Sequence, residues 1–403
     1  MDFTHWATKK NKLDQAHWPC LQRRERGALL LVSLSMGMWS CGPPSEGMDE
    51  VEEAGPRLTG VEFAEFFGFS EGRDTLWLQS ADGEWTPWTR GERASGAEAV
   101  SSDAALAIEL PLAPKVATWS TTHVPHLQAL QAKDLWVGTG YRDRINLSKA
   151  APHQWPMDLG GDGGLDEEAL VASGAHVLTS YPFGDPMQGV DSRTGVKVMP
   201  LREYEEEHPL ARAEYIKLFG WLLDRVPAAD VAFGQIAQRY AAARDRGQQL
   251  ALDSGRPVVF TGSEQGGLWT APTFDGLVAR LVEDAGGHYL LDHQTEQSMG
   301  LRRVGSNIEM ELEQFAMMAA GADAWGKVVY APEGWYRQDA AAAMPWLPLE
   351  DKLLFHCNTA EVDYFGQAVL EPDFMLEDLV SILHGQTTEG GAPRYFQRTR
   401  NEP

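Results

Sequence analysis

The sequence predicts an α/β protein with two lobes joined by a helical connector, and three observations carry this prediction. Strand and helix patterns alternate between residues 115 and 199, which is typical of a parallel sheet flanked by helices. Apolar side chains then recur at helical spacing over residues 209–250, and Pro227 divides this stretch into two helices. The strand–helix alternation restarts at residue 256, and the 403 residues are enough for two domains.

The composition indicates a folded, acidic protein. Hydrophobic residues make up 43% of the chain, which is typical of a globular protein and excludes a wholly disordered one. There are 58 acidic and 34 basic side chains, and the formal net charge is −24. A field of that sign repels phosphate backbones, so we expect no nucleic-acid partner. Three cysteines are too few for a disulfide framework or a cysteine-rich zinc site.

The first lobe is expected over residues 58–205. It begins with a tryptophan-rich hairpin or pair of edge strands over residues 73–88, where apolar and polar residues alternate. Its further strands are expected at 115–119, 134–138, 175–179 and 194–199, with helices at 124–133 and 165–173.

The connector is expected over residues 206–250 and the second lobe over 251–387, followed by a C-terminal tail over 388–403. The strands of the second lobe are expected at 256–260, 288–291, 327–330 and 352–356, and its helices at 274–285, 311–320 and 372–383.

The N-terminus predicts export. Residues 1–26 carry six basic and three acidic side chains, and residues 27–40 are fourteen uncharged residues in a row. A membrane-spanning helix needs about 20 apolar residues, so this run fits a signal-peptide core better, with a buried helix as the alternative. Ser40 before Cys41 resembles the cleavage box of bacterial lipoproteins, which predicts lipidation of Cys41. Residues 41–57 are rich in Pro, Gly and Glu and predict a flexible tether.

Three blocks of the mature chain carry a resemblance to a known family. They are the segment 208–219, the segments 268–272 and 281–289, and the spaced residues Glu313, Phe315, Ala319, Ala322, Asp323 and Trp325. On these blocks the chain resembles the ABC-transporter substrate-binding lipoproteins of the iron-complex (siderophore) and cobalamin periplasmic-binding family, over residues 112–385. The resemblance implies two Rossmann-like lobes joined by a helical connector, the class III periplasmic-binding-protein architecture.

The resemblance implies that a metal complex (an iron–siderophore, haem or a cobalamin-type ligand) binds in a cleft between the lobes and is not altered. The rule that ligands of open α/β sheets bind at the carboxyl ends of strands places the cleft walls in the loops there. Aromatic rings supply stiff contact area and arginine a planar fork for anionic oxygens. The candidate ligand-binding residues are Trp119, His123, Tyr141, Arg142, Tyr181, Trp269, Tyr336 and Arg337.

The family also implies docking on a membrane permease, which works with its ATPase. In that family an acidic residue near a helix start on each lobe meets basic residues of the transporter. Glu167 and Glu313 occupy such positions here, where the helix dipole also favours negative charge. The protein is therefore expected to be lipid-anchored and to face the periplasm or the extracellular side. We expect no catalytic residue, resident metal or cofactor.

Two other functions stay open. A receptor for a free divalent ion such as zinc or manganese could use His123, but zinc needs three or four converging ligands and no His-x-x-x-His pair exists. An exported hydrolase could use Ser263, but this serine directly follows Gly262, so the Gly-x-Ser-x-Gly register is absent. No phosphate-binding glycine motif is present either.

Overall fold

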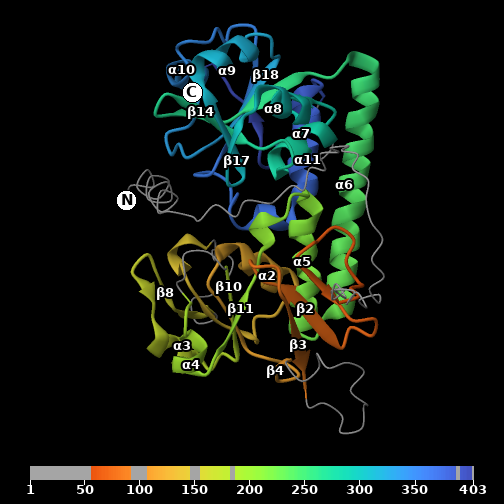
Figure 1. The fold of residues 1–403 in the computed structure, drawn as a ribbon, viewed down its shortest axis with the longest axis vertical. Helices are drawn as coiled ribbons and strands as arrows, with labels where there is room; N and C mark the ends of the chain where they lie inside the picture. The colour runs from red at the N-terminus through yellow and green to blue at the C-terminus, as the bar shows by residue number, and fades with distance from the viewer. Residues whose placement is uncertain (1–55, 92–106, 146–154, 182–186, 387–390, 402–403) are drawn as a thin grey trace, which may run out of the picture. The chain divides into compact units, whose positions relative to one another are not determined.

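The computed structural model describes residues 56–91, 107–145, 155–181, 187–386 and 391–401 (Figure 1). From Arg57 onward these residues belong to one compact unit. The predicted signal peptide, Cys41 and most of the predicted tether lie outside the described residues. In the described part of the chain, no helix combines the length and the apolar character that crossing a bilayer requires.

The first α/β region, residues 116–200, is built on a parallel five-stranded sheet of order β11-β10-β5-β6-β7. Its parallel pairing confirms the prediction from the alternating pattern. The strands are β5 (Val116–Thr118), β6 (Trp136–Thr139), β7 (Met157–Asp158), β10 (Val177–Ser180) and β11 (Lys197–Pro200). The helices are α2 (Val124–Ala129), α3 (Glu167–Ser173) and α4 (Val190–Thr194), and a short β8–β9 pair (Gly160–Gly161, Gly164–Leu165) precedes α3.

Helix α3 shows how the local sequence sets its ends. The Asp166 carboxylate accepts a hydrogen bond from the Ala169 N–H at the start, and Gly174 ends the helix in a left-handed conformation. The 3-10 turns η2 (Thr121–His123) and η3 (Arg142–Arg144) follow β5 and β6 directly. The loops at these strand ends are therefore ordered into turns that fix their side chains.

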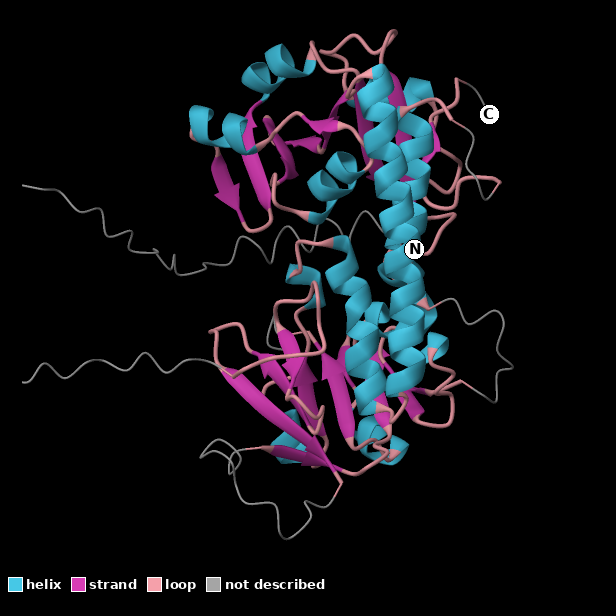
Figure 2. Cartoon of the chain, turned by 90° about the vertical axis from the view of Figure 1, so that its right-hand side faces the viewer, coloured by secondary structure: helices cyan, strands magenta, loops and turns pink. Residues whose placement is uncertain are grey.

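Two packed helices follow the first region, α5 (Pro209–Leu222) and α6 (Val226–Ser254), after the short turn η5 (Glu203–Glu205). Pro209 lies in the first turn of α5, and Pro227 lies in the first turn of α6 rather than within a helix, so the predicted division is confirmed. Figure 2 shows the two helices side by side. A Cβ at Gly220 would come within 2.3 Å of the Ala229 Cβ, so glycine permits this close approach.

The second α/β region, residues 258–398, has its own five-stranded sheet of order β15-β12-β18-β19-β20. The strands are β12 (Val258–Thr261), β15 (His288–Tyr289), β18 (Ala324–Val329), β19 (Leu353–Asn358) and the antiparallel β20 (Gln397–Arg398). The expected helices α7 (Leu277–Asp284), α9 (Leu312–Ala319) and α11 (Pro372–Leu383) are present, with α8 (His293–Met299), α10 (Arg337–Ala343) and the turn η6 (Gln367–Leu370) in addition.

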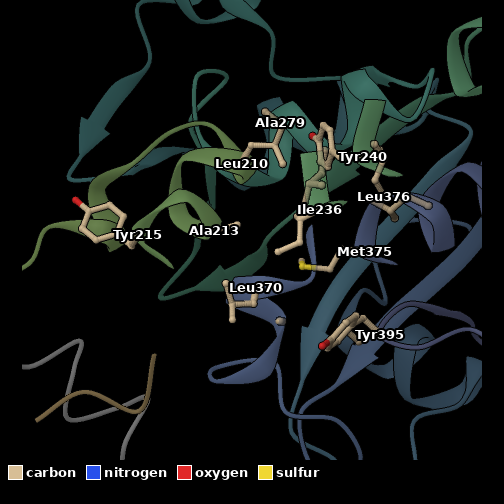
Figure 3. Close-up of a cluster of buried hydrophobic side chains, with 14 of the residues drawn as sticks. Leu210, Ala213, Tyr215, Ile236, Tyr240, Ala279, Leu370, Met375, Leu376 and Tyr395 are labelled. Carbon is tan, nitrogen blue, oxygen red and sulfur yellow. The ribbon is translucent and has the colours of Figure 1, made fainter. Parts of the chain in front are cut away.

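Side chains of the connector helices and of the second region share one core. Leu210 on α5, Ile236 and Tyr240 on α6, Ala279 on α7 and Leu376 on α11 gather in the cluster of Figure 3. All five are at most 6% exposed. Since burying an aliphatic side chain stabilises a fold by about 1.5–3 kcal/mol, this cluster ties the connector firmly to the second region.

An antiparallel sheet of order β13-β14-β17-β16 was not predicted. It consists of β13 (Ser263–Gln265), β14 (Leu268–Pro272), β17 (Asn307–Glu311) and β16 (Arg302–Val304). Gly266 and Gly267, both with positive φ, form the two-residue turn between β13 and β14. A Gly-Gly pair between short apolar runs is a hairpin signal, so the sequence contained a clue to this element.

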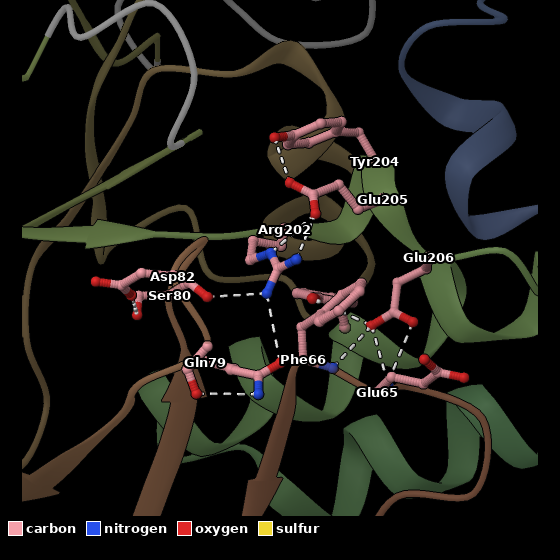
Figure 4. Close-up of polar contacts among 11 residues, drawn as sticks. Glu65, Phe66, Gln79, Ser80, Asp82, Arg202, Tyr204, Glu205 and Glu206 are labelled. Carbon is pink, nitrogen blue, oxygen red and sulfur yellow. Dashed lines mark hydrogen bonds and ion pairs between the residues drawn. The ribbon is translucent and has the colours of Figure 1, made fainter. Parts of the chain in front are cut away.

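The predicted hairpin before residue 110 is present as β2 (Thr75–Gln79) and β3 (Trp85–Arg90), flanked by β1 (Phe67–Phe69) and β4 (Ile108–Leu110). Buried carboxylates attach this sheet to the connector. The Glu214 carboxylate accepts hydrogen bonds from the N–H groups of residues 62–64 at 2.8–2.9 Å. Figure 4 shows the second carboxylate, that of Glu206, which accepts hydrogen bonds from the N–H groups of Glu65 and Phe66 at 3.1–3.3 Å. The Arg202 guanidinium lies 3.8 Å from the Phe66 ring centroid and donates to the Ser80 carbonyl.

The segment after residue 390, predicted as a tail, is joined to the second region in the same way. The Asp378 carboxylate on α11 accepts hydrogen bonds from the N–H groups of Arg394, Tyr395 and Phe396 at 2.7–3.1 Å. Tyr395 and Phe396 are buried, and the two residues that follow them form β20. This segment therefore completes the second sheet.

Candidate ligand-binding site

The loops after β6 and β10 bring two of the predicted ligand-binding residues together. Tyr141 follows β6 in the left-handed conformation, with φ of 49°. Its side chain is hydrogen-bonded to that of Tyr181, which directly follows β10. Burial, and next the neighbouring Tyr181, raise the pKa of Tyr141 far above its usual value. The Tyr141 phenol is thus a neutral hydrogen-bonding group at physiological pH.

Arginines surround this tyrosine pair. The Arg144 guanidinium lies 4.8 Å from the Tyr141 ring centroid and forms an ion pair with Asp162 at 2.5 Å. The Arg142 guanidinium lies 4.9 Å from the ring centroid of Trp155. These cation–π contacts hold the planar guanidinium groups in place, and guanidinium N–H groups are donors that suit anionic oxygens.

Trp119 and His123 lie beneath this surface rather than on it. Trp119 is 1% exposed, its ring centroid is 5.2 Å from that of Tyr141, and a Cβ at Gly140 would come within 2.5 Å of it. His123 is fully buried, with Nδ1 3.0 Å from the Thr179 hydroxyl. These side chains offer a ligand almost no surface, so the structure gives them a packing role under the Tyr141 loop.

His123 also contacts a buried carboxylate. Its Nε2 lies 3.2 Å from the Glu203 carboxylate, which accepts a further hydrogen bond from the Thr122 hydroxyl at 2.7 Å. Burial alone would raise the pKa of Glu203, but the charge and hydrogen bond of His123, with that of Thr122, outweigh it and lower the pKa. The pair links the loop after β5 to the turn η5 that begins the connector.

In the second region the predicted residues are engaged in the fold. Trp269 on β14 is 1% exposed and stacks on Phe315, with ring centroids 4.1 Å apart and an interplanar angle of 7°. Tyr336 caps the start of α10. The Arg337 guanidinium donates to the carbonyls of Leu349, Glu350 (2.9 Å) and Lys352 (3.1 Å). The Tyr336/Arg337 pair therefore fixes the loop around α10.

The second region contains a cavity of about 190 Å³ that sequence reasoning did not identify. It lies at the carboxyl end of β12 and along β18, beneath α7 and α11. Thr261, Ser263, Lys327 and Tyr364 are the polar residues of its lining.

The strand-end loops of the two regions touch each other. The Thr121 hydroxyl in η2 donates to the Phe365 carbonyl, in the loop after β19, at 3.4 Å. A small gap beside this contact is lined by Pro125 and Arg144 from the first region and by Asp363 from the second. Phe365 itself is 50% exposed. Loops at the carboxyl ends of both sheets are therefore neighbours, as a shared binding site requires.

The two predicted docking carboxylates have different surroundings. Glu167, in the first turn of α3, forms an ion pair with Arg193 on α4 at 2.6 Å. This hydrogen bond lowers the pKa of Glu167. Glu313, in the first turn of α9, is exposed and forms no ion pair with any described residue. Across the described ranges, no group of three or more His, Cys, Asp or Glu side chains is placed to hold a metal ion.

Comparisons with known proteins agree with this fold. No family model matches the chain. A lipoprotein of uncharacterised function from Methanocaldococcus jannaschii is 21% identical over 303 residues, which cover 72% of this chain and 69% of the relative. A periplasmic haem-binding protein from Pseudomonas aeruginosa superposes with a TM-score of 0.52 at 14% identity, covering 72% of this chain and 99% of that one.

A periplasmic binding protein from Veillonella parvula superposes with a TM-score of 0.55 at 15% identity, covering 77% of this chain and 98% of that protein. Both solved structures are matched over nearly their whole length, although sequence identity is low. The expected architecture is thereby confirmed: this chain has the fold of the periplasmic binding proteins, with its parallel sheets joined through paired helices.

Proposed function

We propose that the protein is the extracytoplasmic binding component of an ABC importer for a metal complex, an iron–siderophore, haem or cobalamin-type ligand. The observation that carries this proposal is the near-complete structural match to two periplasmic binding proteins, one of which binds haem. The lipoprotein relative supports an anchor at Cys41 and a position outside the cytoplasm. The ligand would be bound and released without chemical change.

The first region supplies the best-supported ligand contacts. Tyr141, Tyr181 and Arg142 lie together at the carboxyl ends of β6 and β10, where the rule for α/β sheets places ligands. Two tyrosine rings and a guanidinium group suit a bulky anionic chelate, because aromatic faces bind its body and N–H groups bind its oxygens. Tyr336 remains a candidate ligand contact from the second region, whereas Arg337 donates hydrogen bonds to backbone carbonyls.

The experiment is a thermal-shift screen of the full chain with ferric siderophores, haem, cobalamin and the free ions Zn²⁺ and Mn²⁺. A ligand present at 100 times its Kd stabilises the folded state by about 2.7 kcal/mol, which gives a clear shift of the melting temperature. We expect one metal complex to give this shift. Stabilisation by a bare divalent ion alone would replace the proposal with a metal-ion receptor.

Arg142→Ala tests the placement of the ligand in the same screen. We expect it to weaken the binding of the identified complex at least tenfold. Lys133→Ala is the matched control, because it removes the same charge from an exposed position after α2. Equal losses in the two variants would mean that net charge, and not the position of Arg142, controls affinity.

A further inference from the structure

The cavity in the second region has a volume of about 190 Å³ and is partly open to solvent. Its lining is mainly apolar and includes Val278 and Val282 on α7, Leu379 on α11, Val328 on β18, Phe355 on β19 and Phe396 just before β20. Protein interiors are normally packed without voids of this size, and an empty apolar cavity forfeits packing contacts. An apolar group that filled this space would therefore gain those contacts.

Lys327 is the charged residue among those that line the cavity, and its ammonium faces away from the cavity. It lies between Gly326 and Val328 on β18, and successive residues of a strand point to opposite faces of the sheet. Gly326 and Val328 face the cavity, so the Lys327 side chain lies on the other face. Its ammonium is there 5.8 Å from the Trp325 ring centroid and 5.5 Å from that of Trp335.

The other polar residues of the lining, Thr261, Ser263 and Tyr364, carry uncharged hydroxyl groups. The Thr261 hydroxyl lies 3.3 Å from that of Tyr289, which donates its proton to the Pro272 carbonyl at 2.8 Å. Burial raises the pKa of Tyr364 to about 12, so its phenol is neutral at physiological pH. Moving an ion from water into such a site costs desolvation that no opposite charge offsets. The lining therefore favours an uncharged ligand.

Two phenylalanine rings shape the cavity on the strand side. Phe355 is the neighbour of Gly326 in the pairing of β19 with β18, and a Cβ at position 326 would come within 2.2 Å of the Phe355 ring. Glycine thus lets this ring lie over the adjacent strand. The ring centroids of Phe355 and Phe396 are 6.1 Å apart at an interplanar angle of 75°, an edge-to-face arrangement. Further aromatic rings pack favourably against such a pair.

The volume limits the ligand to a single ring. Benzene binds in an engineered apolar cavity of about 150 Å³, so a cavity of this size holds one six-membered ring with a small substituent. We propose that the second-region cavity binds one uncharged aromatic ring. Ser263 follows β12 and Tyr364 follows β19, so the cavity reaches the carboxyl edge of the sheet, where ligands of α/β sheets bind. The ring is either a free molecule or, resting on the proposed function, a ring group of the bound metal complex.

Toluene is the first probe, tested against the full chain by isothermal titration calorimetry. Benzoate carries the same ring with a negative charge, and methylcyclohexane has a similar size without the aromatic ring. We expect one toluene to bind per chain, at least tenfold more tightly than either. Nuclear Overhauser contacts between the toluene ring protons and the methyl groups of Val278 and Val328 would place it in the cavity. No saturable binding of toluene, contacts elsewhere, or equal affinity for benzoate overturns the proposal.

Variants that change the volume of the cavity provide the second test. Val278→Phe should fill the cavity and weaken toluene binding at least tenfold, whereas Val231→Phe, the matched control at an exposed position, should leave it unchanged. Leu379→Ala should enlarge the cavity and bind naphthalene at least tenfold more tightly than the unmodified protein does, a gain that misfolding cannot produce. Lys327→Met should not change toluene affinity, because the ammonium lies on the other face of the sheet. Unchanged toluene affinity in Val278→Phe would show that the assigned cavity is wrong.

Haem and a ferric tris-catecholate complex distinguish the two sources of the ring. Displacement of toluene by either complex identifies the ring as part of the metal complex, and simultaneous binding identifies it as a separate molecule; either result supports the cavity assignment. If a complex stabilises the protein while toluene does not bind, the proposed function stands and the cavity assignment fails. If toluene binds in the cavity while no metal complex stabilises the protein, the proposed function fails and the cavity assignment stands.

Discussion

The same dipeptide, tyrosine followed by arginine, occurs after a strand in each α/β region, and the structure uses the two copies differently. Tyr141 and Arg142 follow β6, where the tyrosine bonds to Tyr181 and the guanidinium stacks on an indole ring. Tyr336 and Arg337 begin α10, where the tyrosine caps the helix and the guanidinium donates to three backbone carbonyls.

The difference shows that a strand-end position does not by itself decide what an arginine does. Three carbonyl groups of residues 349–352 converge on Arg337, and they need a donor because they are partly shielded from water. Around Arg142 the face of the Trp155 ring is available instead. The first region is thus the better candidate for ligand contacts.

Trp269→Ala gives the largest expected effect and tests whether this indole belongs to the core of the second region. Loss of a buried, stacked tryptophan should lower the free energy of unfolding by about 3–5 kcal/mol. Urea denaturation measures it. Tyr181→Phe, in the first region, keeps the ring and should cost no more than about 1.5 kcal/mol. A small loss of stability in Trp269→Ala would make this residue a candidate ligand contact again.

A pH titration compares how the connector and the second region hold the chain segments that are hydrogen-bonded to their buried carboxylates. Burial raises the pKa of Glu206 to about 7 and that of Asp378 to about 6. A folded-state pKa above the unfolded value means that the native protein binds more protons, so stability is highest below the unfolded pKa and falls as pH rises through the folded one. The Glu206 shift corresponds to a loss on the order of 3 kcal/mol between about pH 4.5 and 7.

Glu206→Gln should flatten the stability profile between about pH 5 and 7, and Asp378→Asn should flatten it between about pH 4 and 6, because each variant removes one titrating group. Urea midpoints measured across this range give the profile. An unchanged slope in Glu206→Gln would show that the carboxylate is already ionised at low pH, held so by the N–H groups of Glu65 and Phe66.

Arg337→Ala against Arg142→Ala tests the opening comparison directly. Removing Arg337 leaves three carbonyls without their donor and should lower the free energy of unfolding by about 1–3 kcal/mol. Removing Arg142 forfeits a cation–π contact, which amounts to about 0.5–1 kcal/mol. Ligand affinity should fall more in Arg142→Ala than in Arg337→Ala. If both variants lose equal stability and equal affinity, the two pairs have the same role.

The smallest effect on stability is expected for Glu167 and Glu313, the two carboxylates predicted to dock on a permease. Glu313→Lys reverses an exposed and unpaired charge, so ligand binding should be unaffected while uptake by whole cells falls. Arg193→Ala frees Glu167 from its ion pair and should leave uptake unchanged or raised. Normal uptake with Glu313→Lys would show that Glu313 is not the docking residue of the second region.

Much of the fold could be predicted because hydrophobic periodicity is a local property. Helix α11 begins and ends at the predicted residues, and Pro227 separates the two connector helices because proline fits only a first helical turn. The sheet around β14 was not predicted, since its strands are short and β14 and β17 pair across about 40 residues. Local patterns carry no information on such pairing.

The sequence by itself determined the order of strands and helices, the connector and the loops in which a binding site would be sought. Only the tertiary structure decided which side chains of those loops reach the surface. Trp119 and Trp269 are buried because other residues, Gly140 and Phe315, meet them from distant strands and helices. The cavity of the second region also arises from packing between elements, because its volume depends on what lies opposite each side chain in space.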